Sequence, residues 1–285
     1  MSWRRTLDAS GQRLGQRNTM LPSVLGWTAC LLGWAACLLN WTACLLGWLL
    51  LLVMTLRVAL GPDGVDALRA RLMAWAMNRF KTQQEQQLAA IKAELFEEMK
   101  QMHLDILEIG VGCGTNLQHY PAGSVLTCVD PNIHFQDYFR RTCVEHAAHL
   151  HPDIRFVVGH GEDMTAVKDG SVDAVVLTLV LCSVRDPSKV VHEVQRVLRP
   201  GGKFIYLEHI GFPENTFQRR IQDALTHSGV WPCVMQCWLN RDPRKVIEAG
   251  HFRSVEQRLQ PIVEHLSLCS PLHLMNRCLT GVATK

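Results

Sequence analysis

The stretch that decides the fold is LDILEIGVGCGTN, residues 104–116. An apolar, strand-like run leads to Glu108, and Gly110, Gly112 and Gly114 follow at every second position. Glycine is required where a backbone turns sharply and lies close to a ligand, and a helix that begins after the turn offers free N–H groups. The stretch therefore predicts a nucleotide-binding turn between a strand and a helix.

The spacing of the glycines distinguishes between two kinds of nucleotide cofactor. The dinucleotide fingerprint G-x-G-x-x-G needs a third glycine where Thr115 or Leu117 stands, so neither register fits. The pattern E-x-G-x-G-x-G is instead that of S-adenosylmethionine binding, in which no pyrophosphate has to be held. On this interpretation Glu108 and the three glycines contribute to the cofactor site.

Further apolar runs follow in the order expected of an α/β protein. SVLTCVD ends in Asp130, where a carboxylate can bind both ribose hydroxyls of a nucleoside. IRFVVGHGEDM is followed by GSVDAVVLTLVLCSV and, after a helical segment, by VLRPGGKFIYLEHI. We expect a doubly wound, mostly parallel sheet that binds its ligand at the carboxyl ends of the strands. Glu162 or Asp163 would then reach the adenine edge, and Thr178 would lie beside the methionine moiety.

The amino-terminal part of the chain has a different composition. No charged residue lies between Arg17 and Arg57, and residues 24–56 are almost wholly apolar. This is longer than the roughly 20 residues that one membrane-spanning helix needs. The tract repeats a seven-residue phrase with tryptophan in the same position: Trp27, Trp34, Trp41 and Trp48. Because it lacks the charged flanking positions of a soluble coiled coil, it predicts a membrane anchor, either a tilted single span or a re-entrant hairpin.

These patterns divide the 285-residue chain into four parts. Residues 1–20 form a basic segment, whose four arginines and one aspartate account for the formal net charge of +3. Residues 21–60 form the anchor. Residues 61–103 begin with the turn signal GPDG and continue as amphipathic connecting helices, and residues 104–285 form the cofactor-binding domain.

Charge and cysteine content favour some classes of protein over others. Outside residues 1–20 the acidic and basic side chains balance, without the basic stripe that nucleic-acid binding requires. The eleven cysteines lie mostly in apolar runs rather than at disulfide-scaffold spacings, which favours reduced thiols facing the cytosol. Cys233 and Cys237 lack further Cys or His residues at zinc-like spacing, so no metal site is predicted.

Several motifs together resemble the class I S-adenosylmethionine-dependent methyltransferases: LEIGVGCGTN, YPAGSVLTCVDPNIHF, GEDM, TLVLCSV and RVLRPGGKFIYLEH. Within that superfamily, residues 94–285 are similar to a membrane-anchored, methyltransferase-like group of thiol S-methyltransferases. The resemblance implies a Rossmann-like sheet, S-adenosylmethionine as the cofactor, and five cofactor ligands: Gly110, Gly112, Gly114, Asp130 and Glu162. It is weakest over residues 227–252, in the region where class I enzymes place substrate-contacting elements.

The resemblance implies in-line transfer of a methyl group to a small lipophilic thiol. It also implies attachment to the endoplasmic reticulum and to lipid droplets. The cysteine usage, and a sequence whose one N-x-S/T sequon lies inside the apolar tract at Asn40, favour a catalytic domain that faces the cytosol. A thiol needs little acid–base help because it is already partly thiolate at neutral pH. If a base is used, His209, just after the fifth strand, is the candidate. Two alternatives stay open: a lipid or quinone C- or O-methyltransferase, and a non-catalytic protein that organises a membrane surface. The sequence leaves the acceptor's identity and the oligomeric state open.

Overall fold

The computed structural model describes the backbone of residues 20–100, 104–263 and 271–285. Side chains are described from residue 58 onward, except 101–103 and 264–272, and also at Thr55. The chain divides into two compact units, Met1–Asp66 and Ala67–Lys285. The second unit contains all the strands described below.

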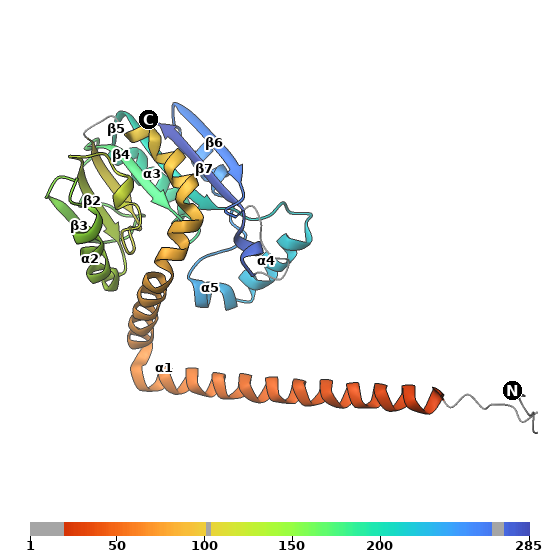
Figure 1. Cartoon of the computed structure of the whole chain (residues 1–285). Coiled ribbons are helices and arrows are strands. Elements are labelled where there is room, and N and C mark those ends of the chain that lie inside the picture. The colour runs from red at the N-terminus through yellow and green to blue at the C-terminus, as the bar shows by residue number, and fades with distance from the viewer. Residues whose placement is uncertain (1–19, 101–103, 264–270) are drawn as a thin grey trace, which may run out of the picture. The chain divides into compact units, whose positions relative to one another are not determined.

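A seven-stranded sheet in the order β3-β2-β1-β4-β5-β7-β6 forms the centre of the second unit (Figure 1). The first five of these strands pair in parallel, and β7 is antiparallel to both β5 and β6. The strands are β1 (Asp105–Ile109), β2 (Val125–Asp130), β3 (Ile154–Val158), β4 (Val172–Thr178), β5 (Leu198–His209), β6 (Ser254–Gln260) and β7 (Cys278–Thr284). The chain winds outward in both directions from the β1/β4 pair, the place where open α/β sheets bind ligands.

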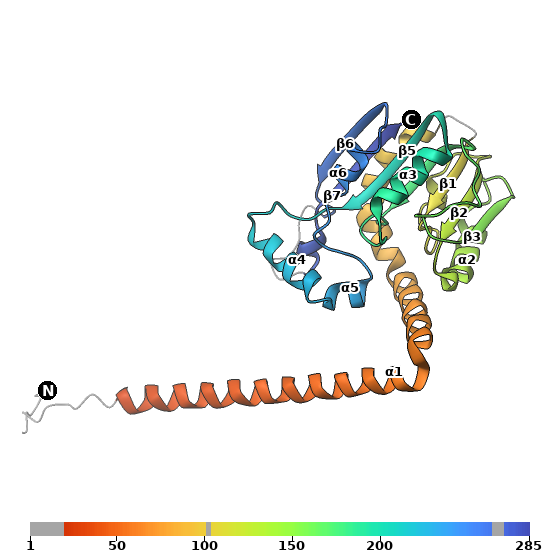
Figure 2. The ribbon, with the colours of Figure 1, turned by 180° about the vertical axis from the view of Figure 1, so that it is seen from behind.

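Successive side chains of the central strands point to opposite faces of the sheet. In β4, Ala174 and Val176 join one apolar core, whereas Val175 and Leu177 join the other. The carboxyl-terminal part of α1 and α2 (Gln136–His146) cover the first face, and α3 (Pro187–Val197) and α6 (Pro243–Glu248) cover the second. Figures 1 and 2 show these two faces. Burial on both sides explains why the strands appear in the sequence as continuous apolar runs.

Helix α1 spans Met20–Leu95 and is broken at Gly61, whose φ of 67° and ψ of 173° are not helical. Its last turns and η1 (Phe96–Met99) pack onto the sheet through five buried residues: Leu88, Ile91, Leu95, Phe96 and Met99. Among the residues whose side chains are described, no helix is long and apolar enough to cross a membrane. The anchor expected at 21–60 lies almost wholly outside those residues and stays a prediction.

The segment after β5 supplies the remaining elements of the second unit. They are α4 (Phe217–His227), α5 (Val230–Met235), α6, the antiparallel pair β6 and β7, and η4 (Pro271–Met275). Two further short helices, η2 (Leu117–His119) and η3 (Ile133–Phe135), follow β1 and β2. Trp238 N donates to Cys182 O at 2.8 Å, so the chain after α5 contacts the turn that follows β4.

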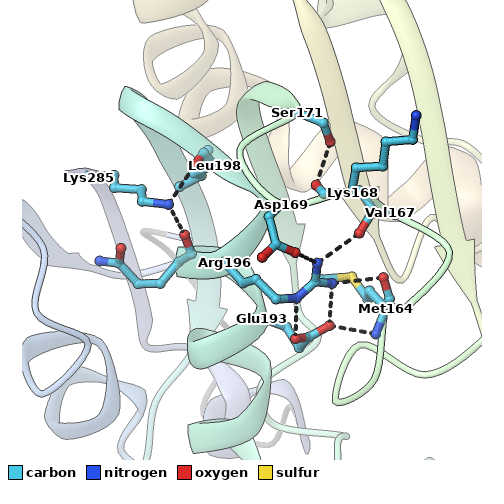
Figure 3. Close-up of polar contacts among 10 residues, drawn as sticks. Met164, Val167, Lys168, Asp169, Ser171, Glu193, Arg196, Leu198 and Lys285 are labelled. Carbon is cyan, nitrogen blue, oxygen red and sulfur yellow. Dashed lines mark hydrogen bonds and ion pairs between the residues drawn. The ribbon is translucent and has the colours of Figure 1, made fainter.

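A guanidinium group fixes the loop between β3 and β4 (Figure 3). Arg196 of α3 donates to both carboxylate oxygens of Glu193, and also to Asp169 Oδ1 at 2.5 Å. The same group donates to the carbonyl oxygens of Met164 and Val167, each at 2.9 Å. Because the guanidinium satisfies so many acceptors at once, the loop that begins just after Glu162 and Asp163 has one defined path.

Candidate active site

The loop after β1 can be built only with glycine at one critical position. Gly110 has a φ of 70°, and its N–H donates to Val129 O at 2.7 Å. A Cβ added at Gly110 would lie 2.5 Å from Val180 Cγ2, whereas one added at Gly112 would meet no atom within 4 Å. The backbone at Gly112, with a φ of 52°, therefore borders open space. This is what a cofactor approaching the backbone closely requires.

Asp130, the last residue of β2, joins this loop to the adjacent strand. Its two carboxylate oxygens accept from Gly112 N and Asn132 N, each at 2.9 Å. The side chain is 4% exposed, and burial raises its pKa. Asp130 therefore lies directly beside the open side of the loop. Each of its oxygens retains a lone pair for a further donor such as a ribose hydroxyl.

Glu108, in β1, is directed into the protein. Its Oε1 accepts from Asn116 Nδ2 at 2.8 Å and its Oε2 accepts from the Tyr120 hydroxyl at 2.7 Å. Burial raises its pKa to about 7, although the two hydrogen bonds and Lys92 oppose that shift. Through these contacts Glu108 holds the segment that follows the three glycines, and so supports the glycine loop from the protein interior. The sequence predicts that Glu108 contacts the cofactor directly. That contact stays a prediction, because the hydrogen bonds that Glu108 accepts within the described part of the chain come from Asn116 and Tyr120.

Replacing Glu108 by glutamine is expected to remove a pH dependence of stability. The pKa of Glu108 is about 7 in the folded chain against an ordinary value of 4.5, so folding favours the protonated carboxyl. Its stabilising contribution is complete below the ordinary value and is lost as pH rises through 7. Between about pH 4 and about pH 8, the unfolding free energy of the wild type should fall by about 3 kcal/mol relative to the variant. Urea unfolding of both chains measures this, and a pH-independent difference would contradict it.

Asn116 connects the glycine loop to the end of β4. Its Nδ2 also donates to Thr178 Oγ1 at 3.0 Å, while its Oδ1 is buried and has no hydrogen-bond partner among the described side chains and backbone. The next residue after Thr178, Leu179, has a φ of 58°, an uncommon conformation for a non-glycine residue. A buried acceptor without a partner is costly. A donor such as the amino group of the methionine moiety of S-adenosylmethionine would satisfy it, so the residues present fit this cofactor.

Glu162 and Asp163 lie after β3, near the start of α3. Glu162 Oε1 accepts from Arg185 N at 2.7 Å and from Asp186 N at 3.4 Å, which holds the turn that precedes α3. Asp163 lies opposite His160 in an isolated bridge. Both residues line an open depression together with Ser188 and three further α3 residues: Lys189, His192 and Glu193. Contact of either carboxylate with adenine stays a prediction.

The part of α1 in the second unit covers the glycine loop, which the sequence analysis did not anticipate. Lys92 is 1% exposed, pairs with Glu85 at 2.6 Å and donates to Thr115 O and Oγ1 at 3.3 and 3.2 Å. Ala74 packs in a small cluster with Cys113 and Phe135. A lysine at a core-facing position among the buried Leu88, Ile91 and Leu95 was the only sequence signal for this contact.

The turn after β4 is held by the end of β5. Glu208 Oε1 accepts from Val180 N at 2.7 Å and from Leu181 N at 2.9 Å, while its Oε2 has no partner. Burial raises the pKa of Glu208 to about 7. Arg241 adds donors to Leu181 O at 2.9 Å and Val184 O at 2.5 Å. The turn that carries Cys182 is therefore fixed from two sides.

His209, the residue expected to act if a base is used, is the last residue of β5. It is 1% exposed, and neither ring nitrogen has a hydrogen-bond partner among the residues that the structure describes. A ring nitrogen of His209 lies close to the sulfur atoms of Cys182 and Cys237: these three atoms are all within 4.8 Å of one another. The nearby Cys182 thiol, followed by the nearby His209, lowers the pKa of Cys237, and the nearby Cys237 raises the pKa of Cys182. Sequence spacing could not reveal this cluster, because its members lie far apart along the chain.

Comparison with known proteins gives a consistent assignment. Residues 107–206 match the family model described as "Methyltransferase domain". The chain is 40% identical over 179 residues to the rat thiol S-methyltransferase TMT1B, covering 60% of this chain and 70% of that protein. It is 39% identical over 195 residues to human thiol S-methyltransferase TMT1A, covering 66% and 78%. Among solved structures, Haemonchus contortus phosphoethanolamine N-methyltransferase 2 with S-adenosyl-L-methionine superposes with a TM-score of 0.52 at 11% identity, covering 73% of this chain and 57% of that chain. That likeness concerns the fold alone.

Proposed function

Because this chain belongs to the family of the thiol S-methyltransferases TMT1A and TMT1B, we propose that it methylates the sulfur of small lipophilic thiols at a membrane surface. The chain is an S-adenosylmethionine-dependent methyltransferase of class I α/β fold. Family membership argues against the non-catalytic alternative. The observation that carries the thiol proposal is the identity of about 40% with two thiol S-methyltransferases.

The residues around the glycine loop account for binding of the cofactor, which supplies a methyl group on a positively charged sulfur. Gly112 leaves room for close approach, Asp130 offers carboxylate oxygens to the ribose, and Asn116 Oδ1 offers a buried acceptor at the methionine end. Together these groups would hold the cofactor at the carboxyl ends of β1, β2 and β4. Most of the acceleration would then come from holding acceptor, methyl carbon and leaving sulfur in line.

The residues that would border the methyl acceptor suit a small apolar thiol. Val180 and Leu181 beside the loop are buried, and Trp231 and Trp238 from the later segment are half-buried. A thiol with a pKa near 8.5 is a few per cent thiolate at neutral pH and is strongly nucleophilic in that form. Transfer to sulfur therefore does not depend on a strong general base.

Membrane attachment is part of the proposal and rests on two features of the chain. Residues 24–56 are almost wholly apolar. In the second unit, Leu72 and Trp75 of α1 are 56% and 59% exposed, and Arg69 of the same helix donates to Pro232 O of α5 at 2.5 Å. Val234 of α5 is also exposed. These side chains can enter the interface of a bilayer. We propose attachment to the endoplasmic reticulum and lipid droplets with the catalytic unit in the cytosol.

Transfer of radiolabelled methyl groups tests the acceptor. The full chain in detergent is given labelled S-adenosylmethionine with a small alkyl thiol or, in parallel, with a reduced menaquinone precursor. The second acceptor is chosen because the chain is also 32% identical over 106 residues to the demethylmenaquinone methyltransferase of Renibacterium salmoninarum, covering 36% of this chain and 40% of that protein. Labelled thioether is the expected product. Label on the quinol and none on the thiol would overturn the proposal in favour of quinone methylation.

Membrane attachment has a separate test in the full chain. Changing Leu38 and Leu45 to arginine places two charges in the apolar tract, and each costs about 3 kcal/mol at the centre of a spanning helix. The double variant should move from the membrane pellet to the supernatant in cells, whereas Leu38→Ile with Leu45→Ile should stay in the pellet. Equal retention of both variants would contradict attachment through this tract.

A further inference from the structure

Three side chains from distant parts of the chain meet at the carboxyl ends of β4 and β5. Cys182 lies in the turn after β4, His209 ends β5, and Cys237 follows α5. All three are buried, at 4%, 1% and 5% exposure. Their sulfur and nitrogen atoms lie within 4.8 Å of one another, and among the residues that the structure describes no other such group of three is found.

The imidazole of His209 is the observation that points to a ligand at this cluster. An imidazole ring carries at least one N–H donor, and when neutral it also carries an acceptor nitrogen. Both nitrogens of His209 are buried, and neither has a hydrogen-bond partner within the described part of the chain. Buried polar groups in native proteins are nearly always satisfied, by protein, water or a metal ion. The neighbouring sulfur atoms, which are weak hydrogen-bond partners, make a metal the group that would satisfy all three side chains together.

The residue types select zinc among the common metals. Two Cys and one His occur as the protein ligands of catalytic zinc, with the fourth position left open. Two thiolates and one Zn²⁺ carry no net charge, so the burial of this group leaves no uncompensated charge inside the protein. In such a site the ligand atoms are about 3.5 to 3.8 Å apart, given Zn–S and Zn–N bonds of about 2.3 and 2.1 Å. Side-chain rotations that move the ligand atoms by about 1 Å would therefore bring all three within bonding distance of the ion.

Hydrogen bonds from neighbouring residues hold the two cysteine side chains of the cluster in place. Trp231 Nε1 donates to Cys237 Sγ at 3.3 Å, a contact that favours a thiolate sulfur. Cys182 Sγ lies 3.4 Å from Ser183 Oγ, whose hydroxyl can donate to a thiolate, and the turn that carries Cys182 is bound by Glu208 and Arg241. Partners of this kind orient metal ligands and tune the metal.

The cluster also lies beside the cofactor loop. Val180, two residues before Cys182, fills the space that a side chain at Gly110 would occupy. Thr178, at the end of β4, hydrogen-bonds Asn116 of the loop. An ion held by Cys182 would therefore lie at the carboxyl ends of the strands, beside the cofactor loop.

We propose that Cys182, His209 and Cys237 bind a zinc ion, and that the fourth position of this ion receives the sulfur of the acceptor. The second half of the proposal rests on the proposed thiol methyltransferase function, whereas the first half does not. His209 is then a metal ligand rather than a base, which explains how an imidazole without hydrogen bonds can be tolerated at this position.

The reaction balances without an oxidant or reductant. The acceptor's S–H bond breaks when its sulfur binds zinc, and the proton leaves to water. Metal coordination thus supplies the thiolate without a general base. A lone pair of this sulfur forms the new S–CH₃ bond while the bond between the methyl carbon and the cofactor's sulfonium breaks, and that electron pair stays on the cofactor's sulfur. The product thioether is a neutral, weaker ligand and can leave the ion.

Metal content of the full chain tests the first half of the proposal. Protein purified in detergent without chelators should contain about one zinc ion per chain, and Cys182→Ser and Cys237→Ser should each lose most of it. Cys233→Ser is the matched control, because Cys233 is exposed and precedes Cys237 by four residues; it should keep the zinc. Binding of S-adenosylhomocysteine verifies that each variant is folded. Zinc-free wild type that also fails to bind added Zn²⁺ or Co²⁺, or a Cys182–Cys237 disulfide found by mass spectrometry, would overturn the proposal.

X-ray absorption at the zinc edge tests the second half. Adding a small alkyl thiol should raise the number of sulfur ligands from two to three, and the increase should be absent when the corresponding alcohol is added. An unchanged sulfur count with active thiol methylation would overturn the zinc-bound acceptor while leaving the proposed function intact. Bound zinc in a protein that does not methylate thiols would instead refute the proposed function and leave the metal site standing.

Discussion

Asp130→Ala is expected to lower the affinity for S-adenosylhomocysteine and the rate of methyl transfer by roughly 30- to 700-fold. The variant loses two carboxylate hydrogen bonds that hold the loop, to Gly112 N and to Asn132 N, together with the oxygens offered to the ribose. Hydrogen bonds to charged groups contribute about 1.5 to 3 kcal/mol each, or about 3 to 6 kcal/mol for two. Because water can replace part of what the carboxylate supplied, we expect a net loss of about 2 to 4 kcal/mol, which corresponds to this range. Calorimetric titration with S-adenosylhomocysteine measures the affinity directly.

The control for Asp130 is Asp153→Ala. Asp153 is an exposed carboxylate whose side chain pairs with Arg155 at the protein surface. Its removal should change neither cofactor affinity nor transfer by more than about two-fold, because exposed ion pairs contribute little. If Asp130→Ala bound the cofactor as tightly as Asp153→Ala does, Asp130 would not be a cofactor residue.

Gly110→Ala is expected to destabilise the folded protein, whereas Gly112→Ala is expected to weaken cofactor binding. At Gly110 the new methyl group would lie 2.5 Å from Val180 Cγ2 in addition to the strain of a φ of 70°. Overpacking and left-handed backbone each cost about 1 to 3 kcal/mol, so the folded state itself is destabilised. At Gly112 the methyl group meets no protein atom within 4 Å. That variant should fold with a loss of about 1 kcal/mol but obstruct the cofactor.

Two measurements separate these outcomes. The melting temperature of Gly110→Ala should fall by about 5 to 15 °C, and that of Gly112→Ala by only a few degrees. S-adenosylhomocysteine should bind Gly112→Ala at least about ten-fold more weakly than the wild type. Normal cofactor affinity in Gly112→Ala would show that the open space beside this residue does not belong to the cofactor site.

Much of the fold could be predicted from the sequence because local patterns determine it. The apolar runs before Gly110, Asp130 and Thr178 are the strands β1, β2 and β4, and they are parallel neighbours as expected. These strands are buried on both faces, which makes them easy to recognise. The end of the fourth run was less clear, since LVLCSV is as apolar as a strand but forms a turn that starts at Leu179 with a positive φ.

The cofactor loop was the most predictable part of the site, and the residues that would border the acceptor were the least predictable. Gly110, Gly112 and Asp130 lie at strand ends, and parallel strands bring their carboxyl ends together whatever the details of packing. The role of Lys92 depends on how α1 packs over Thr115, and the roles of Glu108 and Glu208 depend on which way their side chains point. Propensity and periodicity do not contain that information.

The sequence by itself determined the class of fold, the glycine turn and the nature of the cofactor, because each of these follows from residue types at fixed spacings within a short segment. Only the tertiary structure brought Cys182, His209 and Cys237 within 4.8 Å of one another. Cys182 is placed by the turn after β4, His209 by the last residue of β5, and Cys237 by a segment that donates its backbone N–H at Trp238 to Cys182 O. The physical reason is that a contact between distant segments is set by how whole elements pack, and no local pattern records it.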